Sequence, residues 1–284
     1  MESRQLSPRR RAYDRVMRFF LYACAGLTCL LLVVIIGYIF FRGVPNITWE
    51  LLTSQQSVIR EVDGILPNII NTLVLIFGTL LFVLPLGVGA AIYLTEYARN
   101  KRVAALIEFA TETLTGIPSI IFGLVGMLFF CQMLGWGGSI RAGIATLVIM
   151  TIPTIVRTTQ ESLKTVPQSY REAALGLGSG KWRMVRTVVL PSSVDGIVTG
   201  CILSIGRIVG ESAALLYTAG GTAMFMKSLG QILTMPGASL SVGLYTYSME
   251  RGKIDVGFAI ATILMLITLC INLLAKWLGR RLKR

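Results

Sequence analysis

Six apolar segments alternate with shorter polar segments along the chain. Each apolar segment is close to the roughly 20 residues that a helix needs to cross a bilayer. We therefore expect six transmembrane helices, at about Phe19–Phe41, Ile69–Leu94, 115–133, Ile140–Val156, Val194–Ala219 and Val256–Leu274. The amphipathic start of 103–133 predicts a surface or half-buried helix before the third span. The stretch 220–253 is half-apolar, but glycine and proline interrupt it, which favours a re-entrant or interfacial segment over a further span.

This pattern predicts an all-α integral membrane protein without a separate soluble domain. The expected divisions are a cytoplasmic basic tail at 1–18, a first transmembrane helix at 19–41, an extracytoplasmic loop at 42–65, a core of five helices at 66–274 and a cytoplasmic basic tail at 275–284. The basic flank of the first helix imitates a signal peptide. Its apolar run is longer than the roughly 7–15 residues of a signal sequence, so we expect the helix to be retained.

Composition and the distribution of charge support this topology. Hydrophobic residues make up 54% of the chain and charged residues 14%, whereas soluble domains carry about 25% charged residues. The net charge of +13 is divided among short loops, so a nucleic-acid partner is not expected. Twenty lysines and arginines fall on the side of the two tails and the 157–192 loop, and six fall on the other. The positive-inside rule therefore predicts that both termini are cytoplasmic.

The residue patterns of a metal site or an enzyme are missing from the sequence. The chain has no histidine, and its five cysteines lie in apolar runs without any zinc-binding spacing. Paired carboxylates beside a plausible nucleophile are also lacking. We therefore expect no catalytic residues and no bound metal. A stand-alone channel remains an alternative to a transporter subunit.

The 157–192 loop is long, polar and patterned. The fourth helix is expected to continue to about Lys164, where Pro167 would stop it. Ser169 and Glu172 form a capping-box pattern that predicts a short new helix, and Gly178 would end that helix. Such a helix either docks on another protein or lies on lipid headgroups.

A glycine-rich run inside the loop, Gly176–Lys181, imitates a phosphate-binding P-loop. The pattern fails because Leu175 occupies the first glycine position and Trp182 replaces the Ser/Thr that would contact magnesium. We therefore expect no cofactor in this chain and no ATP site of its own.

The same loop resembles the EAA loop of ABC importer permeases. Glu172-Ala173-Ala174, Gly178 and Val188–Pro191 keep the residues and spacing of that loop, with valine for isoleucine as the only change. The likeness covers most of 66–274 and implies a type I ABC importer permease core of five helices, preceded by one extra N-terminal helix. It also implies a set of residues that couple the membrane helices to a separate ATPase, which would bind ATP and magnesium: Glu172, Ala173, Ala174, Gly178, Leu190 and Pro191.

Two charged residues fall inside the fifth span. Arg207 lies near the middle, where an arginine costs roughly 2.5–3.5 kcal/mol, and Glu211 follows one helical turn later, so the two can pair. One interpretation is an anion-handling site in which the guanidinium binds a tetrahedral oxyanion. The hydroxyls of Ser204, Ser212 and Thr218 would assist it. The other interpretation is an internal ion pair that locks two helices together.

The segment Arg207–Ala213 is similar to the Arg-x-x-Gly-Glu-Thr/Ser segment of phosphate-specific ABC permeases. Further likeness to their A-type (PstA-like) subunits lies at Ala91–Tyr97, Pro118–Ile120, Arg157–Thr159 and Leu215–Ala219. The resemblance implies a phosphate importer in a prokaryotic cytoplasmic (inner) membrane. Its implied partners are a sister permease in a heterodimer, two ATPase subunits and an extracytoplasmic phosphate-binding protein. A permease of the same fold for sulfate or molybdate is the main alternative.

Two other features remain open. Glu108 and Glu112 are expected to bond to basic loop residues at the cytoplasmic interface, with a role in transport as the alternative. The stretch Gly220–Lys253 is expected outside, where it either contacts a binding protein or closes the outer mouth.

Overall fold

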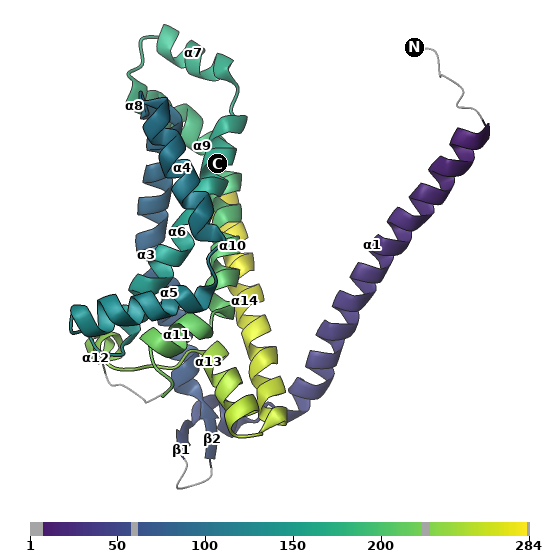
Figure 1. Cartoon of the computed structure of the whole chain (residues 1–284), viewed down its shortest axis with the longest axis vertical. Coiled ribbons are helices and arrows are strands. Elements are labelled where there is room, and N and C mark those ends of the chain that lie inside the picture. Colours follow the sequence, from purple (N-terminus) through teal and green to yellow (C-terminus); the bar gives the residue numbers. More distant parts are fainter. Residues whose placement is uncertain (1–7, 58–61, 223–227, 283–284) are drawn as a thin grey trace.

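The computed structural model describes residues 8–57, 62–222 and 228–282, which are almost entirely helical (Figure 1). The outermost residues of both predicted tails, and two basic residues used to predict the topology, Arg60 and Lys227, lie outside these ranges. Four helices are long and apolar enough to cross a membrane: Ala12–Asn46, Leu66–Tyr97, Ile140–Thr165 and Ile254–Arg281. Two bent helix pairs bring the number to six if each pair counts as one span. The predicted all-α membrane fold is confirmed.

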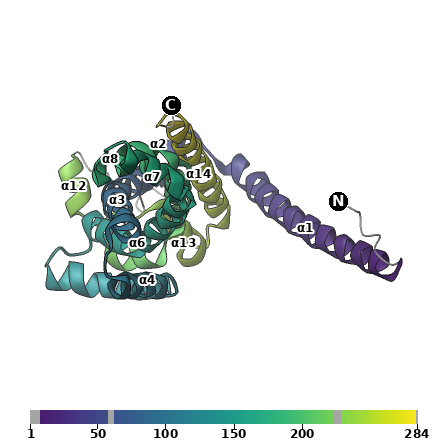
Figure 2. The same cartoon turned by 90° about the horizontal axis from the view of Figure 1, so that it is seen from above.

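Helix α1 (Pro8–Gly43) begins inside the segment predicted as a polar tail. Most of its length stands apart from the other helices, as both views show (Figures 1 and 2). It meets them at its C-terminal end, where Gly43 lies against Phe258 and Thr262 of α14 (Ile254–Leu282). The Tyr38 ring also packs edge-on against Phe258, with 5.5 Å between the ring centroids. The apolar surface of α1 is therefore left for lipid or for another membrane subunit.

The centre of the bundle is the parallel pair α3 (Leu66–Ile92) and α6 (Ile140–Thr165). Gly78 lies against Ile144 and Gly87 against Ile155, so the backbones approach closely along the whole contact. Helix α10 (Val194–Gly210) packs on α6, and α14 packs on α10. The fully buried side chains of Leu75, Ile76, Leu147 and Ile205 fill the space between these helices.

Sharp bends interrupt the helices at two predicted spans. The helix expected before the third span is α4 (Lys101–Thr115), which ends before Pro118. The predicted span 115–133 corresponds to α5 (Ser119–Gly126) and the π-helical turn that continues it, Met127–Met133. Helices α4 and α5 are bent by 101° because proline and the glycine before it interrupt the helix, so α5 lies across the bundle in Figure 1.

The fifth span does not reach Ala219 as one helix either. Helix α10 ends at Gly210, and the short α11 (Ala213–Thr218) follows and packs against α5. At its other end, α10 is bent by 65° from the segment Lys181–Ser192.

A small structured layer covers the end of the bundle opposite α7. The predicted loop at 42–65 contains a 3₁₀ turn, Val44–Asn46, helix α2 (Trp49–Thr53) and an antiparallel hairpin. The strands of the hairpin are β1 (Gln55–Ser57) and β2 (Val62–Ile65). Lys253 Nζ lies 2.7 Å from Asp63 Oδ1 and fixes the hairpin to the start of α14.

In the described part of 220–253, no helix is long enough to span, as predicted. The elements there are α12 (Leu229–Thr234), α13 (Leu240–Tyr245) and a π-helical turn, Thr246–Glu250.

The opposite end of the molecule carries α7 (Gln168–Gly176), α8 (Lys181–Met184), a π-helical turn at Val185–Val189 and α9 (Leu190–Ser192). Helix α6 continues to Thr165, as predicted, and supports α7 at the outermost point of the bundle. The first turn of α1 and the last turns of α14 lie toward this same end of the long axis (Figure 1).

Candidate functional site

The predicted capping box does not start helix α7. Pro167 is the N-cap residue, with φ −57° and ψ 141°, and no side chain caps the helix. Proline suits a helix start because its φ is already helical and it has no N–H to satisfy. The helix therefore begins at Gln168, and Ser169 lies within the first turn, where its hydroxyl cannot act as the cap.

Gly178 ends α7 as predicted. Its φ is +80°, in the left-handed region, where a side chain would be strained. The Gly178 N–H donates to the Leu175 carbonyl at 2.9 Å, and the Ser179 N–H donates to the Ala174 carbonyl at 3.2 Å. These two bonds form a Schellman motif, which satisfies the last carbonyls of the helix.

Helix α7 has an inner and an outer face. Ala174 is half-buried and packs on a cluster that includes Leu163, Val185 and the part-buried Leu190. The rest of its surface, called the outer face below, is exposed to solvent and includes Tyr170, Glu172, Ala173 and Leu177. Pro191 is exposed at the start of α9, away from this face. The six predicted coupling residues therefore divide between packing inside the subunit and an exposed surface.

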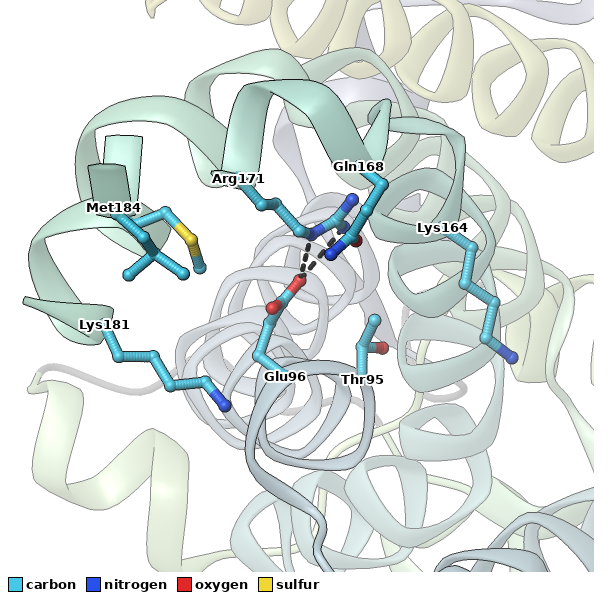
Figure 3. Close-up of a pocket in the computed structure, with 8 residues that line it drawn as sticks. Thr95, Glu96, Lys164, Gln168, Arg171, Lys181 and Met184 are labelled. Carbon is cyan, nitrogen blue, oxygen red and sulfur yellow. Dashed lines mark hydrogen bonds and ion pairs between the residues drawn. The ribbon is translucent and has the colours of Figure 1, made fainter. Parts of the chain in front are cut away.

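A buried ion pair beneath α7 escaped sequence reasoning. Arg171 Nη2 and Nε both lie 3.0 Å from Glu96 Oε1, which belongs to the π-helical turn Tyr93–Tyr97 at the end of α3. In Figure 3 the Glu96 carboxylate points toward the Arg171 guanidinium. The two residues are 75 positions apart, so no local pattern joins them. The available signal for Glu96 was its place in Ala91–Tyr97, one of the segments that carry the family resemblance.

Arg207 lies on an exposed stripe of α10 together with Leu203, Gly206 and Gly210. Its side chain is half-buried, whereas the neighbouring Ile208 is buried. Within the described residues, Arg207 makes neither an ion pair nor a hydrogen bond. An arginine placed in this way can bind a group that comes from outside the chain.

The predicted Arg207–Glu211 pair is absent from the described part of the chain. Helix α10 ends at Gly210, and Glu211 has an extended backbone with ψ 113°, so the four-residue helical spacing no longer applies. The Glu211 carboxylate instead accepts from the Ala214 N–H at 2.9 Å and stabilises the start of α11. The backbone carbonyl of Glu211 accepts from Ser241 Oγ at 2.7 Å. Glu211 thus connects the break in the fifth span to α13.

The predicted hydroxyl groups do not surround Arg207. Ser204 is fully buried on the face of α10 that packs on α6, and its Oγ has no partner among the described residues. Thr218 is also buried and donates to the Ala214 carbonyl at 2.8 Å. Ser212 precedes α11 without capping it. Across the described ranges, no hydrogen bond or ion pair joins any two of Arg207, Glu211, Ser204 and Ser212.

A buried polar network binds residues 238–240, which precede and begin α13, to the start of α3. Asn68 Nδ2 donates to the carbonyls of Ala238 at 3.3 Å and Ser239 at 3.2 Å. Asn71 Nδ2 also donates to Ala238, at 3.2 Å. The Leu240 N–H donates to Thr72 Oγ1 at 2.8 Å. The start of α3 is therefore fastened to the loop that reaches Glu211 through Ser241.

Glu108 bonds to a basic residue, as predicted. Its carboxylate accepts from Gln160 Nε2 at 3.0 Å and lies 3.6 Å from Lys164 Nζ, both near the C-terminal end of α6. Glu108 and Glu112 line a small cavity of about 150 Å³, but the Glu112 carboxylate bonds to no basic residue among the described ones, so that part of the prediction is wrong.

Residues 83–284 match the model of the family described as binding-protein-dependent transport system inner membrane component. The chain is 34% identical to the probable ABC transporter permease protein YqgI of Bacillus subtilis, over 95% of this chain and 96% of that protein. It is 36% identical to the phosphate transport system permease protein PstA 2 of Mycobacterium bovis, over 98% of this chain and 96% of that protein.

Solved structures of importers share the fold. One chain of a bacterial ABC transporter that imports the acidic polysaccharide alginate superposes with a TM-score of 0.66, at 19% identity, covering 96% of this chain and 100% of its own. One chain of the MetNI methionine ABC transporter, in an inward-facing conformation, superposes with a TM-score of 0.59, at 21% identity, covering 78% of this chain and 95% of its own. At these identities the likeness shows the fold alone.

Proposed function

Since this chain belongs to the family of binding-protein-dependent transport system inner membrane components and is a permease subunit of an ABC importer, we propose that the ion it transports is phosphate. The relatives named phosphate transport system permease protein PstA support this substrate, at 36% identity over 98% of the chain in the Mycobacterium bovis protein. YqgI, which is similar over a comparable length, carries no substrate in its name.

Arg207 is the observation that carries the proposal. It lies in the last turn of α10, 13 residues or about 20 Å from the start of that helix, within the predicted fifth span. An unpaired arginine is costly there, and within the described chain it has no bonded partner. A phosphate ion offers two oxygens in the geometry that a guanidinium binds. The energetic cost of Arg207 is then offset when the substrate is bound.

We propose that α7 couples this pathway to a separate ATPase. Its outer face exposes Tyr170 and Leu177 at the cytoplasmic end, where an exposed apolar surface suits a protein partner. Two ATPase subunits would bind ATP and magnesium, and this chain would need no cofactor. A sister permease would complete the pathway along the Arg207 stripe, and an extracytoplasmic binding protein would deliver phosphate. Both termini would be cytoplasmic, in a prokaryotic inner membrane.

Uptake by the complete reconstituted complex tests the substrate. Proteoliposomes that contain this chain, its sister permease and its ATPases would be supplied with the binding protein and radiolabelled phosphate. We expect uptake that requires ATP on the ATPase side and that unlabelled phosphate suppresses, whereas sulfate and molybdate do not. Preferential suppression by sulfate or molybdate would assign the same fold to another oxyanion. Uptake without ATP would point to a channel and contradict the proposal.

A further inference from the structure

Arg171 joins three elements at the cytoplasmic end. It belongs to α7, its Nε and Nη2 donate to Glu96 at the end of α3, and its remaining bonds go to the end of α6. Nη2 donates to the Leu163 carbonyl at 2.8 Å, and Nη1 donates to the Val166 carbonyl. The carbonyls of a last helical turn lack partners inside the helix, so one guanidinium satisfies the end of α6 and the carboxylate of α3 together.

The pair is shielded from solvent. The side chains of Arg171 and Glu96 are only 12% and 7% exposed, unlike those of the other ion pairs at this end. Lys164 lies 3.6 Å from Glu108 and extends away from Glu96 in Figure 3, and Lys181 Nζ lies 5.0 Å from the centroid of the Tyr97 ring. Among the described residues, Arg171 is the one cation bonded to Glu96. Water therefore screens this pair far less than an exposed one.

Helix α7 does not pack solidly against the bundle. A cavity of about 380 Å³ lies beneath it, lined by Thr95, Glu96, Lys164, Arg171 and Lys181, among others. Among the described residues, α7 is connected across this space by the packing of Ala174 and by the hydrogen bonds of Arg171. The chain itself connects α7 to α6 through Val166 and Pro167, but no covalent connection of this kind leads from α7 to α3.

We propose that the Arg171–Glu96 pair carries the displacement of α7 to α3, so that α3 and α6 move as one body when the ATPase moves α7. Arg171 and Glu96 are thus positioning residues for transport. The proposal rests on the proposed function of α7 as the coupling helix, and it adds which second helix receives the motion and through which side chains.

A distance measurement separates this role from a merely structural one. Spin labels would be placed at Tyr93→Cys, at the end of α3, and Ser169→Cys, in the first turn of α7, both exposed, after the native cysteines are replaced. In the reconstituted complex, the label distance should stay the same when ATP is trapped on the ATPases. With Glu96→Gln added, the distance should change, because α7 still moves and α3 no longer follows. An unchanged distance in the Glu96→Gln complex would overturn the proposal.

Coupling gives a second readout. Transport per ATP hydrolysed should fall on the order of tenfold in Glu96→Gln, with basal ATP hydrolysis retained. Transport per ATP hydrolysed should fall less in Arg171→Lys, because lysine keeps the charge but loses the two-pronged geometry. Glu161→Gln removes the partner of Arg157 in an exposed ion pair of 3.1 Å and should behave as wild type. Wild-type coupling in Glu96→Gln would contradict the proposal.

A separate variant identifies failure of the underlying function. Leu177→Asp on the outer face of α7 should release the ATPases from the purified complex, because it places a charge in the proposed apolar contact. If Leu177→Asp retains the ATPases, the coupling function of α7 itself is wrong. If Leu177→Asp releases them and Glu96→Gln leaves both readouts unchanged, only the route to α3 is wrong.

Discussion

Arg171 and Arg207 are two arginines in opposite situations. The guanidinium of Arg171 is satisfied inside the subunit, by Glu96 and two carbonyls at the end of α6. Arg207 is half-buried on α10 and has no bonded partner within the described ranges. A buried charge with internal partners connects the elements that carry it, and removing one partner is strongly destabilising. A buried charge without internal partners lowers stability until another molecule supplies a partner. This difference separates a binding site from a structural contact.

The largest expected stability effect is at Arg171. Arg171→Ala leaves the Glu96 carboxylate buried without its partner and should lower the free energy of unfolding by about 3–5 kcal/mol. Reversible unfolding in SDS, followed by tryptophan fluorescence, would measure it. Arg157→Ala is the matched control, because its pair with Glu161 is exposed and should contribute less than about 1 kcal/mol. Equal losses in the two variants would remove the distinction between buried and surface pairs.

Variants of Glu211 test whether Arg207 takes part in an internal ion pair. Glu211→Ala removes the acceptor for the Ala214 N–H and should cost about 1–2 kcal/mol, as other capping losses do. Glu211→Gln keeps an acceptor oxygen and should cost clearly less in the same SDS titration. If the neutral glutamine were as damaging as alanine, the charge itself would matter, and pairing with Arg207 would have to be reconsidered.

Gly178 variants test whether a local backbone conformation determines where α7 ends. Gly178→Ala places a side chain at φ +80° and should cost about 1 kcal/mol, seen as faster proteolysis at the end of α7. Gly180→Ala is the matched control, since its φ is −70° and a Cβ there would meet open space. The interpretation of Gly178 as a required helix end would be contradicted by equal proteolysis of the two variants.

Arg207 should show the smallest stability effect of the four. Arg207→Ala removes a charge without internal partners, so the free energy of unfolding should change by less than about 0.5 kcal/mol or rise. The same SDS titration measures it. A loss comparable to that of Arg171→Ala would mean that Arg207 has a structural partner after all, and the comparison between the two arginines would fail.

The sequence predicted what depends on local composition. The long apolar runs correctly indicated α1, α3, α6 and α14, because a spanning helix satisfies its own backbone and needs only apolar side chains. Gly178 was predicted as a helix end because the left-handed conformation there is a local backbone property.

Breaks and distant contacts could not be predicted in the same way. Apolar side chains continue through the end of α10, so hydropathy did not reveal the break after Gly210. The expected Arg207–Glu211 pair assumed an unbroken helix and was wrong for that reason. The Arg171–Glu96 pair joins residues 75 positions apart and depends on how α3, α6 and α7 converge.

Phosphate uptake by Arg207 variants tests the central claim most directly. In proteoliposomes that contain the complete complex, Arg207→Ala should abolish uptake of radiolabelled phosphate while the complex assembles and basal ATP hydrolysis continues. Arg207→Lys should retain a fraction of it, because the charge remains without the planar fork. Wild-type uptake by Arg207→Ala would show that the unpartnered arginine does not serve the transported ion.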